Sequence, residues 1–128
     1  MKRIIQTDKA PAPIGPYSQA VQAGQMLFVS GQIAIDPATN ELIHGTVADE
    51  ARQVMKNIEA VLSEAGYSFG DVVKTTIFLS SMSLFSEVNE VYGSYFNADY
   101  PARETVAAAG LPKNVNVEIS VVAYNAGR

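Results

Sequence analysis

An arginine and a glutamate near the end of this 128-residue sequence are the residues best suited to chemistry. Arg103 follows Tyr100-Pro101-Ala102 at the start of a run of small residues, and Glu118 lies fifteen positions later within Val-Asn-Val-Glu-Ile-Ser-Val-Val. A guanidinium pairs bidentately with a carboxylate, whereas a glutamate at an apolar position is costly to bury without a partner or a task. The pair predicts a site that grips an acid and activates water. The alternatives are a structural ion pair, or two side chains that point to solvent on opposite faces.

The first half of the chain is expected to supply a shaped loop, a hairpin and a helix. Prolines between positions 11 and 16 stiffen the loop that positions Tyr17, and Gly24-Gln25 is typical of a hairpin turn. Thr46 is expected to cap a helix that Gly66 ends. The expected elements are strands over 2–7, 18–23 and 26–33 and a helix over 47–65, with turns at Asp36-Pro37 and Thr39-Asn40.

The second half is expected to carry both chemical residues on strands. Residues 71–79 are rich in β-branched side chains and predict a strand, and an apolar stripe from Leu84 to Phe96 predicts a second helix, which stops before Pro101. Strands over 103–109 and 115–124 complete the chain. Helices separated by strands predict an α+β fold in which two helices cover one face of a sheet.

The other face of such a sheet needs a cover of its own. Strand 72–77 offers apolar side chains for it, as do the alternating residues Val115, Val117, Ile119 and Val121. A partner subunit is the simplest cover, so the pattern predicts self-association.

Composition sets limits on the class of protein. With 48% apolar and 17% charged residues, residues 1–128 are expected to form one compact domain. Nine basic and thirteen acidic residues give a net charge of -4, which argues against nucleic acid or an anionic membrane as a partner. The sequence has no cysteine, hence no disulfide and no thiolate nucleophile or ligand. No segment fits a signal peptide or a transmembrane span, so we expect a cytoplasmic protein.

Five segments resemble the reactive-intermediate deaminase family, also called RidA or YjgF. They occur in the family's order and span the chain almost from end to end. The segments are Ala12-Pro13-Ile14-Gly15-Pro16-Tyr17-Ser18-Gln19-Ala20, Phe28-Val29-Ser30-Gly31-Gln32-Ile33, Val88-Asn89-Glu90-Val91-Tyr92, Tyr100-Pro101-Ala102-Arg103, and Leu111-Pro112-Lys113 running into Val117-Glu118-Ile119. The resemblance implies a chorismate-mutase-like fold and a homotrimer, with a ligand cleft at each subunit boundary.

The resemblance also implies an activity, the hydrolysis of 2-imino and enamine acids to 2-keto acids and ammonia. Such substrates include 2-iminopropanoate and 2-iminobutanoate. By this resemblance Arg103 holds the substrate carboxylate with help from the Gly31 N–H, Glu118 deprotonates water, and the Thr105 carbonyl accepts the imine N–H. It further places Tyr17, Ser30 and Asn89 around the cleft, with Tyr17 contributed by the neighbouring subunit. No metal or cofactor is expected.

Two other functions remain open at this point. A non-catalytic sensor of small carboxylates would use the same Arg103 cleft, and some relatives are described as RNA-cleaving or translation-inhibiting proteins, a role that the acidic charge disfavours. Many family members carry cysteine where this chain has Thr105. Some subgroups lack the arginine or the glutamate and are not known to be deaminases, so the presence of both favours the active subgroup. Tyr17 packing at a loop boundary and Asn89 as a helix-surface residue are the plain alternatives.

Overall fold

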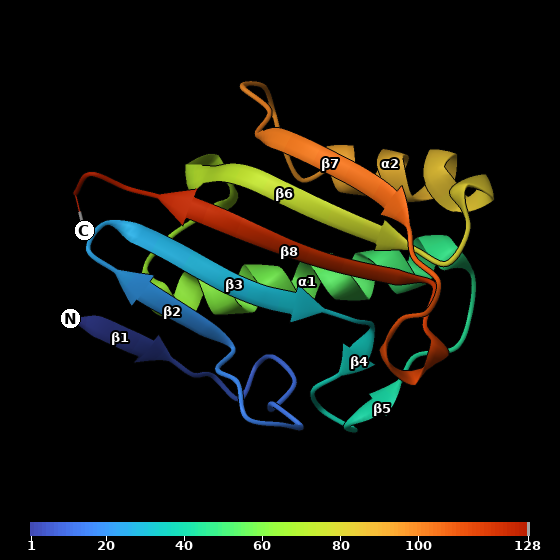
Figure 1. Cartoon of the computed structure of the whole chain (residues 1–128), viewed down its shortest axis with the longest axis horizontal. Coiled ribbons are helices and arrows are strands. Elements are labelled where there is room, and N and C mark those ends of the chain that lie inside the picture. Colours follow the sequence, from blue (N-terminus) through green and yellow to red (C-terminus); the bar gives the residue numbers. More distant parts are fainter. Residues whose placement is uncertain (128) are drawn as a thin grey trace.

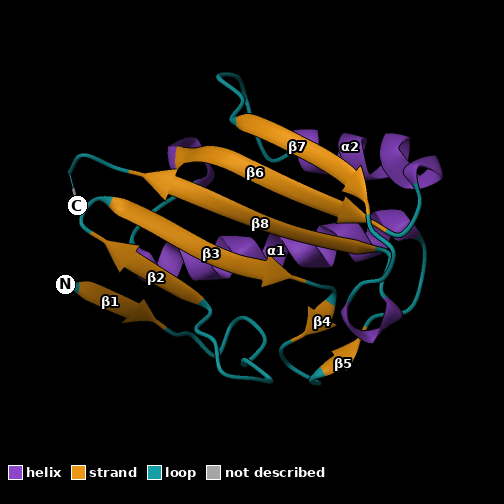
Figure 2. Ribbon diagram, in the orientation of Figure 1, coloured by secondary structure: helices purple, strands orange, loops and turns teal. Residues whose placement is uncertain are grey.

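The computed structural model describes residues 1–127, which form one α+β domain. Two helices of this part of the chain cover one face of a six-stranded sheet (Figures 1 and 2), as the sequence pattern predicts. The strands lie in the order β1 (Lys2–Ile5), β2 (Ala20–Ala23), β3 (Met26–Gln32), β8 (Val117–Tyr124), β6 (Val72–Leu79) and β7 (Ala102–Ala107), and the helices are α1 (Val47–Ala65) and α2 (Phe85–Gly93). Neither helix is long and apolar enough to cross a membrane.

The sheet is antiparallel except at one edge. Strands β1, β2 and β3 pair consecutively, β3 then pairs with β8, and β8 pairs with β6. Strands β6 and β7 are parallel, because α2 carries the chain back between them. Arg103 lies opposite Thr75 in this parallel pair, and Glu118 lies opposite Phe78 on the other side of β6.

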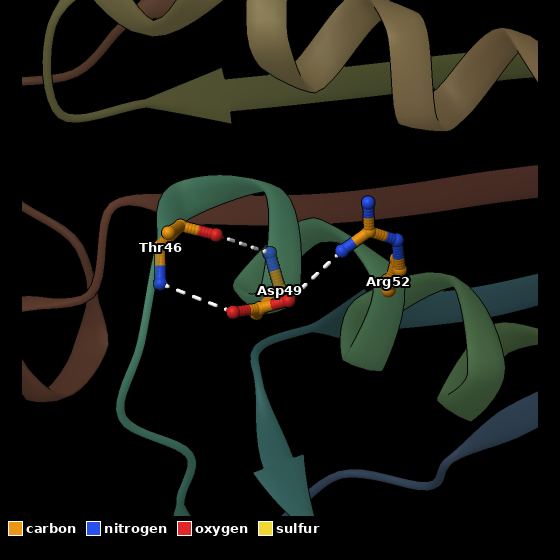
Figure 3. A network of polar contacts seen from close by, with 3 residues as sticks. All are labelled: Thr46, Asp49 and Arg52. Atoms are coloured by element: carbon orange, nitrogen blue, oxygen red, sulfur yellow. Dashed lines mark hydrogen bonds and ion pairs between the residues drawn. The ribbon is translucent and has the colours of Figure 1, made fainter.

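Helix α1 begins and ends at the residues that the sequence predicts. The Thr46 hydroxyl accepts the Asp49 N–H (3.1 Å), and the Asp49 carboxylate accepts the Thr46 N–H (3.3 Å), which completes a capping box (Figure 3). Arg52 adds an ion pair to Asp49 at 2.8 Å. Gly66 ends the helix in the left-handed conformation, with φ 81°.

The core lies between the helices and the sheet. The prediction that Val117, Ile119 and Val121 of β8 lie on the face without helices was wrong, because all three are buried beneath the helices. Alternation along the strand therefore turns Glu118 to the open face. Strand alternation fixes which residues share a face, but it does not state which face the helices cover.

Two further expectations differ from the structure. Turns were expected at Asp36-Pro37 and Thr39-Asn40, with no strand around them, yet β4 (Ile35–Asp36) pairs with β5 (Glu41–Leu42) as a small separate sheet. Its apolar residues pack with Val115 in a satellite core. Helix α2 ends at Gly93, before the end of the predicted apolar stripe at Phe96. The Ser94 hydroxyl donates to the Val91 carbonyl (2.6 Å) at this point.

Candidate active site

Glu118 borders a narrow cavity on the open face of the sheet. The cavity has a volume of about 60 Å³, and most of its wall is apolar. It is lined by Pro11, Ala12, Ile14, Tyr17, Gln19, Gly31, Gln32, Ile33, Ile35, Pro112 and Glu118. Tyr17 and Glu118 are the titratable side chains among these residues.

Gly31 lies directly beneath the Glu118 side chain. The pairing of β3 with β8 shifts register between Val29 and Gln32, which places a bulge at this point of the strand. A Cβ atom at position 31 would lie 2.9 Å from Glu118 Cδ and 3.0 Å from Cγ, closer than such atoms approach. Glycine therefore leaves the space that the glutamate occupies, and this explains a glycine within a strand.

Burial raises the pKa of the Glu118 carboxyl above its ordinary value. The cause is desolvation, since the carboxylate loses water contacts at the apolar wall of the cavity. A carboxylate with a raised pKa is a stronger base toward water than an exposed one, and it still ionises once the pH exceeds that pKa. The environment of Glu118 therefore suits proton abstraction.

The loop beside Glu118 is held by Gln19, a residue that the sequence analysis did not single out. Gln19 is buried, and its amide nitrogen donates to the carbonyls of Thr7 (3.0 Å), Ala10 (3.2 Å) and Pro11 (2.8 Å). Its amide oxygen accepts the Thr7 N–H (2.7 Å). One side chain thus fastens the proline-containing segment that forms one wall of the cavity. A glutamine between such a loop and an apolar strand was the available signal.

Tyr17 and Ser30, both expected to line the cleft, have different surroundings. Tyr17 lines the cavity and is half exposed, and its hydroxyl accepts a long hydrogen bond from the Ile14 N–H (3.5 Å). The Ser30 hydroxyl donates to the Ser18 carbonyl (2.6 Å), so it ties β3 to the same loop. Ser30 therefore supports the position of the loop, and contact with a ligand remains a prediction for it.

Arg103 lies on the helix-covered face, packed between aromatic side chains of α2. Its Cζ is 5.5 Å from the centre of the Phe85 ring and 5.3 Å from that of Tyr92. Its Nη1 donates to the Asn89 amide oxygen at 2.6 Å. Tyr92 is itself fixed, because its hydroxyl donates to Thr75 Oγ1 (2.9 Å) within the core. Two cation–π contacts and one hydrogen bond hold the guanidinium in a defined orientation.

Arg103 opens onto a second, larger hollow. This hollow has a volume of about 450 Å³ and is lined by Asn89, Tyr92, Gly93, Tyr100, Pro101 and Arg103. Asn89 lines this hollow and its amide oxygen accepts from the arginine, while contact with a ligand stays a prediction. Tyr92 belongs to the apolar stripe predicted for the second helix and is buried, but the sequence did not indicate that Tyr92 and Phe85 also contact the cation.

Thr105 lies on β7, at the edge of the sheet. The Ala108 N–H points toward β6, because it donates to the Leu79 carbonyl (2.9 Å). Along a strand, the peptide groups of successive residues point alternately toward the neighbouring strand and away from it, and Thr105 is an odd number of positions from Ala108. The Thr105 carbonyl therefore faces away from β6, at the outer edge, where it can accept a hydrogen bond. The Thr105 hydroxyl oxygen is buried and has no hydrogen-bond partner among residues 1–127.

The two candidate catalytic residues do not meet within one chain. Glu118 projects from the open face of the sheet, whereas Arg103 packs against α2 on the covered face. The two hollows share no lining residue. Each hollow contains one of the two residues that the sequence singled out, Glu118 with a carboxyl group in one and Arg103 with a guanidinium in the other. Among residues 1–127 there is no cluster of three or more acidic, histidine or cysteine side chains that could hold a metal ion.

Comparison with known proteins adds independent information. The family model described as Endoribonuclease L-PSP matches residues 7–125. A RutC family protein of Pyrococcus horikoshii is 52% identical over 124 residues, covering 97% of this chain and 98% of the relative. The 2-iminobutanoate/2-iminopropanoate deaminase of Homo sapiens is 46% identical, covering 96% and 90%. The crystal structure of E. coli TdcF with bound serine superposes with a TM-score of 0.93 at 42% identity, covering 97% and 99%.

Proposed function

Because the chain belongs to the YjgF/RidA family, which the Endoribonuclease L-PSP model over residues 7–125 describes, we propose that it hydrolyses reactive 2-imino and enamine acids to 2-keto acids and ammonia. Two groups carry this proposal: the Arg103 guanidinium, which is held by cation–π contacts with Phe85 and Tyr92, and the desolvated Glu118 carboxyl. The human relative named as such a deaminase supports it.

Arg103 would fix the substrate through its carboxylate. The guanidinium offers two parallel N–H donors, and packing by Phe85 and Tyr92 limits its motion, so the imine carbon next to the carboxylate takes a defined position. The Thr105 carbonyl at the strand edge would accept the imine N–H and favour the protonated, more electrophilic form. Binding therefore orients the C=N bond for attack.

Glu118 would supply the base. It takes a proton from water as the water oxygen forms a bond to the imine carbon and the C=N electron pair moves to nitrogen. The carboxyl then gives this proton to nitrogen. As the C–N bond breaks, the hydroxyl oxygen forms the C=O bond and its proton passes to the carboxylate, so ammonia leaves and the 2-keto acid remains. Imines hydrolyse unaided in water, so general-base help of about 10²–10⁴-fold is enough for a useful enzyme.

A site of this kind needs more than one subunit, and we propose the homotrimer that the sequence analysis predicts. In it, Arg103 of one subunit meets Glu118 of the next across a heterologous interface, which closes into a ring with three equivalent clefts. The location of the two half-sites on opposite faces supports this assembly. Large apolar side chains exposed on the open strands support it too, since Ile4, Phe28 and Val106 are each about half exposed.

A charged side chain on the open face is expected to dissociate the trimer into monomers. Phe28 lies opposite Val122 of β8 and is 47% exposed in the single chain, so Phe28→Asp would bury a carboxylate at the interface while leaving the monomer's own core intact. Light scattering should give a trimeric mass for the parent and a monomeric mass for Phe28→Asp, with an unchanged circular dichroism spectrum.

Two variants control for this result. Ser63→Asp adds the same charge on an exposed position of α1 and should remain trimeric. Val117→Asp places the charge in the core, where the parent side chain is fully buried, and should unfold the chain. A parent that is a stable, monodisperse monomer would contradict the shared cleft.

The activity itself is tested by coupling. A serine or threonine dehydratase releases the imine in the same cuvette, and its disappearance is followed with and without the protein. The proposal predicts faster loss of imine than in buffer. No acceleration would favour a carboxylate sensor that uses Arg103 alone.

A ribonuclease role has less support, given the net charge of -4. We place the activity in the cytoplasm, with which a chain lacking cysteine is compatible.

A further inference from the structure

A carboxylate on α1 holds the start of β8, two residues before the proposed base. Glu50 Oε2 accepts the N–H groups of Asn116 (2.8 Å) and Val117 (3.1 Å), and its Oε1 accepts from the Asn116 side-chain amide (3.1 Å). These bonds join residues 66 and 67 positions apart in the sequence. The mechanism above does not use Glu50.

The strand needs this partner because its neighbour ends early. The last pairing of β3 with β8 joins Gln32 to Ile119, so the peptide groups before Ile119 have no strand on that side. An unpaired N–H at a partly buried position is unfavourable, and the Glu50 carboxylate satisfies two in succession. On the other side, Asn116 is bound by Ser80, through its carbonyl (2.9 Å) and its side-chain oxygen (2.8 Å).

The next residue is Glu118, whose side chain fits over Gly31 without room to spare. A change of a fraction of an ångström at the start of β8 would carry the carboxyl away from that position. We propose that Glu50 is a positioning residue for Glu118: it fixes the start of β8 and thereby the place of the base. This inference rests on the proposed function of Glu118.

The number of acceptor atoms determines how far a substitution should disturb the strand. Both carboxylate oxygens of Glu50 are used, and bonds to an ionised acceptor are stronger than bonds to a neutral one. Glutamine keeps one acceptor oxygen, and its NH₂ group cannot accept. Alanine keeps none. The start of β8 should therefore be displaced most in Glu50→Ala, less in Glu50→Gln and not at all in the parent.

Kinetics give the first readout. Glu50→Ala is expected to lower kcat on the order of tenfold, because a small misplacement of a catalytic group is costly. KM should change little, since Arg103 is untouched. Glu50→Gln should recover part of the loss, and Glu64→Ala, an exposed acidic position on the same helix, should match the parent. All variants are compared at a temperature where circular dichroism shows them folded.

The second readout does not depend on activity. The Glu118 carboxyl is titrated by ¹³C NMR, and in Glu50→Ala its pKa should fall toward the ordinary value of glutamate as the side chain leaves the cavity. A role in folding stability alone would not move this titration. Tyr17 is the other titratable group that lines the cavity, so its hydroxyl is followed in the same spectra.

The outcomes separate the two proposals. An unchanged Glu118 titration, or a kcat equal to that of the parent in both Glu50 variants, overturns the positioning role. If Glu50→Ala does not fold, the glutamine variant decides by the same two measurements. A parent that does not turn over imine removes the proposed function alone, because the titration still shows whether Glu50 places Glu118.

Discussion

Replacing Glu118 by glutamine is expected to lower imine turnover by roughly 10²-fold or more. Glutamine keeps the size and much of the hydrogen bonding of the side chain over Gly31 but cannot take a proton from water. Binding of a stable 2-keto acid should change little, because Arg103 provides the main contact with the carboxylate. Turnover is measured in the dehydratase-coupled assay and binding by calorimetry.

Glu64→Gln serves as the control for Glu118→Gln, since it removes an exposed carboxylate from α1 and should leave both measurements at the parental value. If Glu118→Gln turns over imine at the parental rate, the general-base role is wrong. Loss of both turnover and 2-keto acid binding would instead assign Glu118 to the binding of the ligand.

The raised pKa of Glu118 gives the expected pH dependence its sign. The base acts when ionised, so kcat/KM should fall as the pH drops through a pKa above the ordinary value of glutamate, and Glu118→Gln should lack this step. Stability should behave in the opposite sense. Folding favours the protonated form, so the parent loses stability as the pH rises from the ordinary to the raised pKa, and the glutamine variant does not.

Arg103→Lys is expected to lose most of the activity although it keeps the positive charge. A lysine ammonium cannot reproduce two parallel N–H donors, and its point charge would not keep the contacts that the planar guanidinium makes with Phe85 and Tyr92. One charge-assisted hydrogen bond contributes about 1.5–3 kcal/mol, so kcat/KM should fall on the order of 10- to 100-fold. Binding of the 2-keto acid should weaken in parallel.

Arg52→Lys is the matched control for this arginine, because it alters an exposed ion pair on α1 and should not affect turnover. The kcat/KM of Arg103→Ala should be lower still than that of Arg103→Lys. Full activity in both Arg103 variants would exclude the arginine from the site.

Local patterns in the sequence predicted the elements well. The capping box at Thr46 and the glycine at position 66 located α1 at both ends, because these signals act within a few residues. The covered face of β8 was predicted wrongly, since alternation is the same whichever face the helices cover. The two-residue strands β4 and β5 are too short to show any period.

The candidate site shows the same limit. Arg103 and Glu118 were identified by residue type, yet their location on opposite faces depends on strand order and on pairing with β6, which no local pattern contains. Gln19 and Glu50 were missed for a related reason. Each acts through hydrogen bonds to segments distant in the sequence, and only the folded chain brings those partners together.

The measurement that tests the account most directly mixes two inactive variants. Arg103→Ala and Glu118→Gln subunits are refolded together in equal amounts, and imine turnover is compared with that of each variant refolded alone. If each cleft takes Arg103 from one subunit and Glu118 from the next, random assembly makes about a quarter of the clefts intact, so activity should return to about a quarter of the parental value. No recovery in mixed trimers, confirmed by mass, would contradict a cleft shared between subunits.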